Sequence, residues 1–126
     1  MDEPTDLRRT SLYDEHVAAG ARLVPFAGWE MPVQYEGVAA EHEAVRERAG
    51  MFDVSHMGQI STSGPDALAF LQRAVSNDVA KREPGGAQYS CLCADDGGIL
   101  DDLFSYLLGD GSYLTVSNAA NHESDL

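Results

Sequence analysis

Residues 97–106 have the sequence GGILDDLFSY. The two glycines end a turn, two aliphatic residues begin a strand, and the adjacent carboxylates of Asp101 and Asp102 follow before apolar residues resume. Successive side chains of a strand point to opposite faces, so the two carboxylates cannot both face water if one face packs on a core. A carboxylate in an apolar environment needs a partner, so the inward one is either a structural hydrogen-bonding group or part of a ligand site.

The flanking residues predict an antiparallel sheet around this stretch. Residues 95–98 (DDGG) are typical of a hairpin turn, and the short alternating runs on both sides of it are typical of strands. A helix is expected at 64–74, with proline at its tolerated first position and an apolar stripe behind it. We expect strands at 51–60, 87–94, 99–108 and 113–117.

From residue 51 onward the expected order is strand, helix, three strands and the start of a helix at 118–126. This order resembles a ferredoxin-like split β-α-β unit without its closing strand, which implies an α+β fold with an antiparallel sheet. A terminal helix of at most two turns is marginal by itself, and a sheet without one of its covering helices exposes apolar surface. We therefore expect a truncated product or one portion of a larger enzyme.

The preceding residues predict a smaller N-terminal segment. Ser11 is expected to cap a short helix that stops at Gly20, with Asp14 as a box-like partner. Strand-like pieces at 21–26 and 28–35 are each interrupted by a proline, and 38–49 has the pattern of a half-exposed helix. The expected organisation is an acidic disordered lead (1–10), an N-terminal helix and short-strand segment (11–50) and an incomplete sheet domain (51–126).

The charge of the chain is strongly negative. The 126 residues include 21 acidic and 8 basic ones, for a net charge of −13. Such a field repels nucleic acid and anionic membranes, so neither is an expected partner. The acidic residues are scattered along the chain, which favours a halophilic, salt-rich cytoplasm over one cationic partner. A charged and polar N-terminus and the absence of an apolar run of about 20 residues predict no signal peptide and no membrane span.

Several reactive residue types have ordinary structural interpretations. Cys91 and Cys93 lack metal or redox spacing and are expected to be buried free thiols in a reducing compartment. His42 lies near the apolar side of its helix and is expected to be a buried, hydrogen-bonded histidine. The Asp-x-Ser-His run at 53–56 is not expected to be a catalytic triad, because in a strand His56 points away from Ser55. The acidic residues between 95 and 102 lack the spacing of a calcium loop, so no metal is expected.

Several short motifs together resemble one family. The most specific is GMFDVSHM at 50–57, and the other motifs are weak singly. They occur in the order found in glycine cleavage T-proteins, and the chain resembles the N-terminal part of that aminomethyltransferase from about residue 11 to its last residue. The remaining motifs are YDEH at 13–16, FAGW at 26–29, Met31-Pro32, Asn77-Asp78-Val79, Tyr89-Ser90, GGILDDL at 97–103 and Ser117-Asn118.

The resemblance implies a tetrahydrofolate-dependent one-carbon transferase. Enzymes of this family release ammonia from the aminomethyl-lipoyl arm of H-protein and form 5,10-methylenetetrahydrofolate. Residues 51–126 would then be an incomplete folate-binding domain, with tetrahydrofolate as acceptor and lipoylated H-protein as partner. Asp101 matches the catalytic carboxylate that faces the folate, and Asp102 has no implied role. The other implied folate-pocket residues are Met57, Tyr89, Tyr106 and Asn118.

Two folate-binding relatives are the alternatives within this resemblance. Iron–sulfur cluster maturation factors carry a cysteine-containing glycine-rich motif that this chain lacks. Folate domains of sarcosine- or dimethylglycine-oxidising enzymes follow a longer chain, whereas this one begins with Met1. The family's later carboxylate and arginine contacts to folate lie beyond Leu126, so the chain alone is expected to bind folate weakly and to be inactive.

Overall fold

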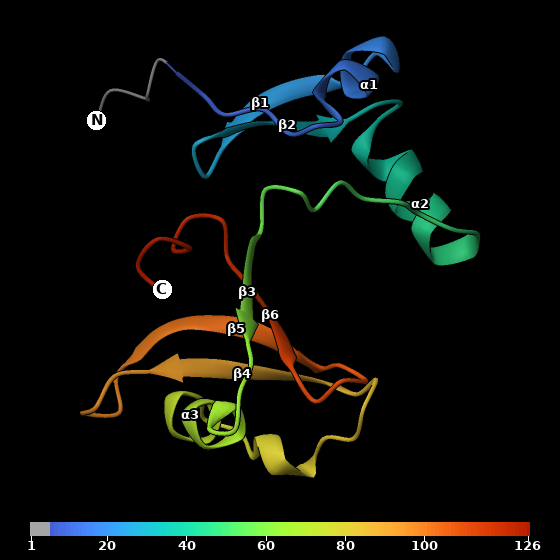
Figure 1. Ribbon diagram of the computed structural model, residues 1–126. Coiled ribbons are helices and arrows are strands. Elements are labelled where there is room, and N and C mark those ends of the chain that lie inside the picture. Colours follow the sequence, from blue (N-terminus) through green and yellow to red (C-terminus); the bar gives the residue numbers. More distant parts are fainter. Residues whose placement is uncertain (1–5) are drawn as a thin grey trace. The chain divides into compact units, whose positions relative to one another are not determined.

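The computed structural model describes residues 6–126, which form two compact units that divide after His56. The first unit contains a two-stranded sheet with two α-helices, and the second contains a four-stranded sheet with one α-helix and a short 3-10 helix (Figure 1). Among the described residues, none of the helices is long and apolar enough to span a membrane.

The first unit is built around a hairpin. Strands β1 (Arg22–Phe26) and β2 (Trp29–Gln34) pair antiparallel, with Phe26 opposite Trp29. The two residues between them, Ala27 and Gly28, both have positive φ, at 50° and 79°. Two consecutive positive φ values match the twist of a tight hairpin, so the strand-like pieces expected from the sequence form one ribbon.

Two helices flank this hairpin. They are α1 (Tyr13–Ala18) and α2 (Val38–Glu47). The expected Ser11 cap is absent, since α1 has Leu12 at its N-cap position and no side-chain cap there. The chain entering α2 is instead fixed by Glu41, whose carboxylate accepts backbone N–H bonds at 2.7 to 2.9 Å from the three residues before the helix, Tyr35, Glu36 and Gly37.

Part of the acidic lead that was expected to be disordered (1–10) is ordered in the structure, at residues 8–10. Residues 1–5 lie outside the described residues. The backbone N–H of Arg8 donates to Gly28 O at 3.0 Å, and the N–H of Glu30 donates to Arg8 O at 2.9 Å. The Arg8 guanidinium lies 4.6 Å from the centre of the Trp29 ring, and Thr10 is buried. Backbone pairing and a cation–π contact thus hold this segment to β2.

The second unit contains a four-stranded antiparallel sheet. The strands lie in the order β3-β6-β5-β4, so the expected α+β class with an antiparallel sheet is confirmed. The topology differs from the expected split β-α-β unit, in which one strand lies between the two strands that the helix connects. Here two strands, β6 and β5, lie between β3 and β4, because short turns at 94–98 and 108–112 make β4, β5 and β6 pair consecutively. The elements are β3 (Gly58–Thr62), α3 (Ala67–Ala74), η1 (Val79–Lys81), β4 (Ala87–Cys93), β5 (Ile99–Leu107) and β6 (Tyr113–Ser117).

The core of this unit lies between α3 and one face of the sheet (Figure 1). The opposite face carries exposed aromatic side chains, with the Phe104 ring 6.1 Å from that of Tyr89 and 5.3 Å from that of Tyr106. Apolar surface of this kind is what an incomplete sheet domain is expected to expose. The buried core cluster comprises Ala67, Leu71, Val75, Val79, Leu103 and Tyr113.

One expected strand is too long, and one expected helix is absent. The strand predicted at 51–60 begins only at Gly58, because the Asp53 side chain accepts the backbone N–H of Ser55 at 2.9 Å and turns the chain before it. The helix expected at 118–126 is replaced by turns. There the amide side chains of Asn118 and Asn121 bind Asp101, which favours the turn over a regular helix.

Replacement of Gly58 with Ala should destabilise the second unit by about 1–3 kcal/mol, the usual cost of overpacking. A Cβ atom at Gly58 would collide with the His122 imidazole and the Ser117 hydroxyl, whereas one at Gly109 has no heavy atom within 4 Å. Gly109→Ala is therefore the matched control. Urea unfolding of both variants measures the difference, and equal midpoints for the two would contradict this packing.

Candidate functional site

Asp101 is buried at the start of β5. Ile99 pairs with Cys93 and Asp101 pairs with Leu92, so β5 has a bulge between these two pairs. The bulge sets the direction of the Asp101 side chain. Asp101 is 6% exposed and lies on the same face as the buried Leu103, whereas Asp102 is half-buried on the other face. The expected separation of the two carboxylates, with Asp101 inward, is confirmed.

The two oxygens of the Asp101 carboxylate have different surroundings. Oδ1 accepts hydrogen bonds at 3.0 Å from the side-chain amides of Asn118 and Asn121. Oδ2 is buried and accepts no bond from an amide or alcohol donor of residues 6–126. Burial raises the pKa of Asp101, but the Asn118 and Asn121 amides outweigh it and the pKa lies below its ordinary value. Asp101 is therefore an ionised carboxylate with Oδ1 held by two amides and Oδ2 buried without an amide or alcohol donor from the described residues.

The other residues implied by the resemblance divide into two groups. Asn118 contacts Asp101 directly and also donates to Asp102 O at 3.0 Å. Met57 is half-buried, and because Gly58 pairs with Ser117, the register places it opposite Asn118. Tyr89 and Tyr106 lie on the exposed face, where the Tyr89 hydroxyl donates to Asp102 Oδ2 at 2.6 Å. The structure thus brings Asp101, Asn118 and Met57 to one end of the sheet and leaves both tyrosines on its other face.

Sequence reasoning missed two residues of this cluster, Asn121 and Asp125. Asn121 supplies the second amide to Asp101, and the Asp125 side chain lies in hydrogen-bonding contact with Asp101. Burial and the neighbouring Asp101 carboxylate raise the pKa of Asp125 above its ordinary value. The available signal is the spacing of polar residues at 118, 121 and 125 directly after the last strand, a pattern that is also typical of a helix start.

A second buried polar cluster lies in the first unit. Asp53 Oδ2 accepts the Thr10 hydroxyl at 2.7 Å and lies 2.8 Å from His16 Nε2, while the Tyr35 hydroxyl lies 2.8 Å from His16 Nδ1. One arrangement satisfies every group: the tyrosine donates to Nδ1, and the Nε2–H donates to Asp53. The histidine partner of Asp53 is therefore His16. Residues 51–57 are not a strand, so the alternation of side chains that separates Ser55 from His56 in a strand does not apply to them.

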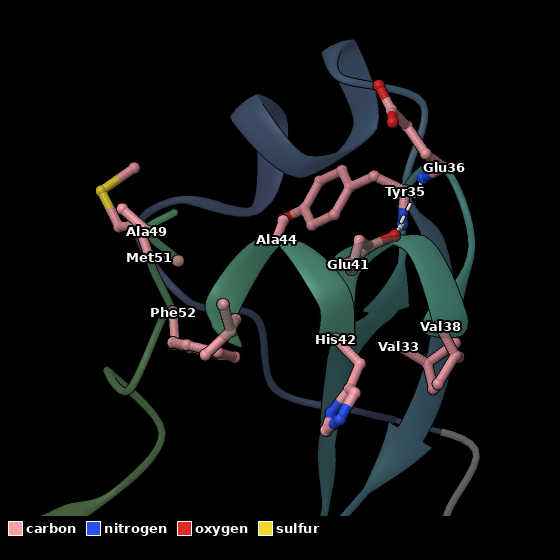
Figure 2. A pocket seen from close by; sticks show the side chains of 12 residues that line it. Val33, Tyr35, Glu36, Val38, Glu41, His42, Ala44, Ala49, Met51 and Phe52 are labelled. Carbon is pink, nitrogen blue, oxygen red and sulfur yellow. Dashed lines mark hydrogen bonds between the residues drawn. The ribbon is translucent and has the colours of Figure 1, made fainter. Parts of the chain in front are cut away.

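The interpretation of His42 as a buried histidine is wrong. His42 is exposed and lines a cavity of about 540 Å³ between α2, the end of β2 and residues 49–52 (Figure 2). The cavity wall is mainly apolar, and the carboxylate of Glu41 is already bound to the backbone. The buried histidine with satisfied ring nitrogens is His16.

Residues 6–126 contain no group of three or more His, Cys, Asp or Glu side chains arranged to hold a metal ion. Cys91 and Cys93 are free thiols, and both are half-buried where full burial was expected.

Comparison with known proteins identifies the family. The family described as the GCVT N-terminal domain matches residues 12–126. The chain belongs to this family. Curated relatives of this GCVT N-terminal domain include aminomethyltransferases of Deinococcus deserti, 56% identical over 96% of the chain, and Rubrobacter xylanophilus, 59% identical over 95%.

A solved structure supports the fold of this GCVT N-terminal domain. The crystal structure of the glycine cleavage system aminomethyltransferase T from Bartonella henselae is 42% identical and has a TM-score of 0.88, covering 94% of this chain and 33% of that one. The chain spans about a third of the length of the curated relatives as well, at 34% and 32% for the two named above. The expected likeness to the N-terminal portion of a T-protein is confirmed.

Proposed function

We propose that this chain is the N-terminal third of a tetrahydrofolate-dependent aminomethyltransferase of the glycine cleavage system. The single observation that carries the proposal is the buried, ionised Asp101 carboxylate, held through Oδ1 and without an amide or alcohol donor at Oδ2, in a chain 51–59% identical to aminomethyltransferases. The reaction takes a methylene unit from the aminomethyl-lipoyl arm of H-protein, releases ammonia and forms 5,10-methylenetetrahydrofolate.

The residues around Asp101 fit an amine-bearing acceptor. Tetrahydrofolate, when bound, supplies the nitrogens that accept the one-carbon unit. A buried, ionised carboxylate accepts the N–H of such an amine and fixes its orientation. It also stabilises positive charge that develops at the reacting centre, with more effect in a dry site than in water. Orientation and electrostatic stabilisation are therefore the main roles of Asp101, and proton acceptance is a lesser one.

The other proposed folate contacts are the four residues implied by the resemblance. Asn118 holds the Asp101 carboxylate, and Met57, opposite it in the register, offers an apolar contact at the same end of the sheet. Tyr89 and Tyr106 offer aromatic contacts from the exposed face. Single substitutions of Met57 and of each tyrosine separate these contributions, because they leave the Asp101 hydrogen bonds unchanged.

An ammonia-release assay tests the proposal. The protein is an aminomethyltransferase that carries this chain as its N-terminal third, supplied with aminomethyl-loaded H-protein. Ammonia release that requires both tetrahydrofolate and H-protein supports the proposal. Release that is independent of folate, or transfer from sarcosine in place of the H-protein arm, would assign the chain to another activity.

We also propose that the chain works in a salt-rich cytoplasm. The net charge is −13, and among the described residues most acidic side chains have no basic partner. Raising salt from about 0.1 M to about 1 M shortens the Debye length from about 10 Å to about 3 Å and weakens the repulsion among these charges. The free energy of unfolding should therefore rise with potassium chloride in thermal or urea unfolding. Full stability in dilute buffer, unchanged by salt, would contradict this adaptation.

A further inference from the structure

The Asp101 cluster contains a second carboxyl group to which the resemblance gives no role. Asp125 lies in the turns after β6, and its backbone N–H donates to Asn121 O at 3.0 Å. The side chain of Asn121 in turn donates to Asp101 Oδ1. Asp125 is therefore held by the same residue that holds Asp101, and the two carboxyl groups face each other in hydrogen-bonding contact.

Each of the two carboxyl groups has one buried oxygen without another donor. Oδ2 of Asp101 and Oδ2 of Asp125 are each inaccessible to solvent, and neither receives a bond from an amide or alcohol donor of residues 6–126. Two ionised carboxylates in this position would repel each other at close range and would both be desolvated. One proton between them removes the repulsion and satisfies both oxygens with a single hydrogen bond.

We propose that Asp101 and Asp125 form a proton-sharing carboxyl pair, in which Asp125 holds the proton and donates it in a hydrogen bond to Oδ2 of Asp101. Asp125 is thus a positioning residue that keeps Asp101 ionised and fixes the oxygen that faces the acceptor amine. This role in transfer rests on the proposed function, whereas the pair itself is a property of the folded chain.

The surrounding groups explain why the proton resides on Asp125. Asp101 receives two side-chain amides and the backbone N–H of Asp102, all of which favour its ionised form. Burial and the neighbouring Asp101 carboxylate favour the protonated form of Asp125, with weaker opposing effects from the Ser117 hydroxyl and the His122 imidazole. Because the amides stabilise the charge on one member only, the two carboxyl groups have pKa values moved in opposite directions.

The pair is tested first without folate. The chain is labelled with ¹³C at its aspartate carboxyl carbons, and the chemical shifts of Asp101 and Asp125 are followed by NMR from neutral to acid pH. We expect one proton to bind above the ordinary aspartate range and the second below it, with both carbons responding to each step. Independent titration of the two groups at ordinary values, or ionisation of Asp125 before that of Asp101, would overturn the pair.

Two variants extend the test, and both are first checked for folded amide dispersion. Asp125→Asn keeps a donor for Asp101 but removes the shared proton, so Asp101 should show a single titration step. Asp66→Asn, an exposed site on another element, should leave both steps unchanged. If Asp125→Asn does not fold, the two-step titration of the unsubstituted chain still decides the matter.

The role in transfer is tested separately in an aminomethyltransferase that carries this chain. Asp125→Asn should lower kcat by roughly tenfold, shift the acid limb of the pH–rate profile and leave KM for H-protein unchanged. Asp125→Glu, which retains a protonatable group, should recover part of the rate. A normal pH profile in Asp125→Asn would overturn the role while leaving the pair intact, and activity without folate would overturn the proposed function instead.

Discussion

Replacement of Asp101 with Asn, in an aminomethyltransferase that carries this chain, lowers turnover by about 10²-fold or more, the usual scale for a lost acid–base or charge-stabilising group. The substitution keeps an oxygen that accepts the amides of Asn118 and Asn121, so the turn that covers the site remains in place. It removes the negative charge and replaces Oδ2 with an amide donor. The loss is thus one of charge and acceptor, and the fold is retained.

The effect of Asp101→Asn is measured as kcat for folate-dependent ammonia release, with the free energy of unfolding measured in parallel. Asp66→Asn is the matched control, since Asp66 is exposed at the N-cap position of α3 and its side chain makes no capping hydrogen bond there. Near-normal turnover of the Asp101 variant would exclude the proposed role. A large loss of stability together with turnover would point to a structural carboxylate.

Replacement of Asp53 with Ala should destabilise the first unit by about 3 kcal/mol, the scale for breaking a buried, charge-assisted pair. Its carboxylate accepts bonds from Thr10 Oγ1 and the backbone N–H of Ser55 and binds His16 Nε2, and the side chain is 1% exposed. The variant leaves a buried imidazole and a buried hydroxyl without their acceptor. Asp14→Ala, an exposed site in the same unit, is the control, and urea unfolding gives the difference.

The same cluster predicts an acid dependence of stability. Burial raises the pKa of Asp53, but the bonds from Ser55, His16 and Thr10 outweigh it and hold the pKa below the ordinary value of 3.8. Because the folded pKa is the lower one, this stabilisation is fully present above about pH 4 and is lost as the pH falls further. Asp53→Ala should therefore lose stability less steeply with acid than the unsubstituted chain. Parallel acid-unfolding curves for the two would contradict this assignment.

The sequence predicted local elements well where one physical signal dominated. The glycine turn at 95–98 and the alternating runs beside it predicted the β4–β5 hairpin, and strand parity predicted that Asp101 points inward. Parity succeeded because the bulge lies before Asp101, so the alternation from Asp101 to Leu103 is regular. The family followed from short motifs whose order is more specific than any one of them.

The failures involve side chains that bond to the backbone or to distant residues. Residues 51–57 alternate like a strand, but the contacts of Asp53 with Ser55 and with His16, 37 positions away, make them a turn. Residues 118–126 have helical composition, but Asn118 and Asn121 bind a carboxylate on another strand. Periodicity reports only which face a residue takes and contains no information on these long-range partners.

The unequal surroundings of the two Asp101 oxygens link the stability of this chain to its chemistry. Oδ1 anchors the turn at 118–125, while Oδ2 receives no amide or alcohol bond from residues 6–126 and remains available to accept a proton or an N–H. A substitution that removes the whole carboxyl group loses the anchor as well as the charge, so stability and activity fall together. Compensating mutations elsewhere can restore only the stability. This position therefore leaves little room for neutral drift, and new chemistry at this site is more readily reached by changes around Oδ2 than by replacing Asp101.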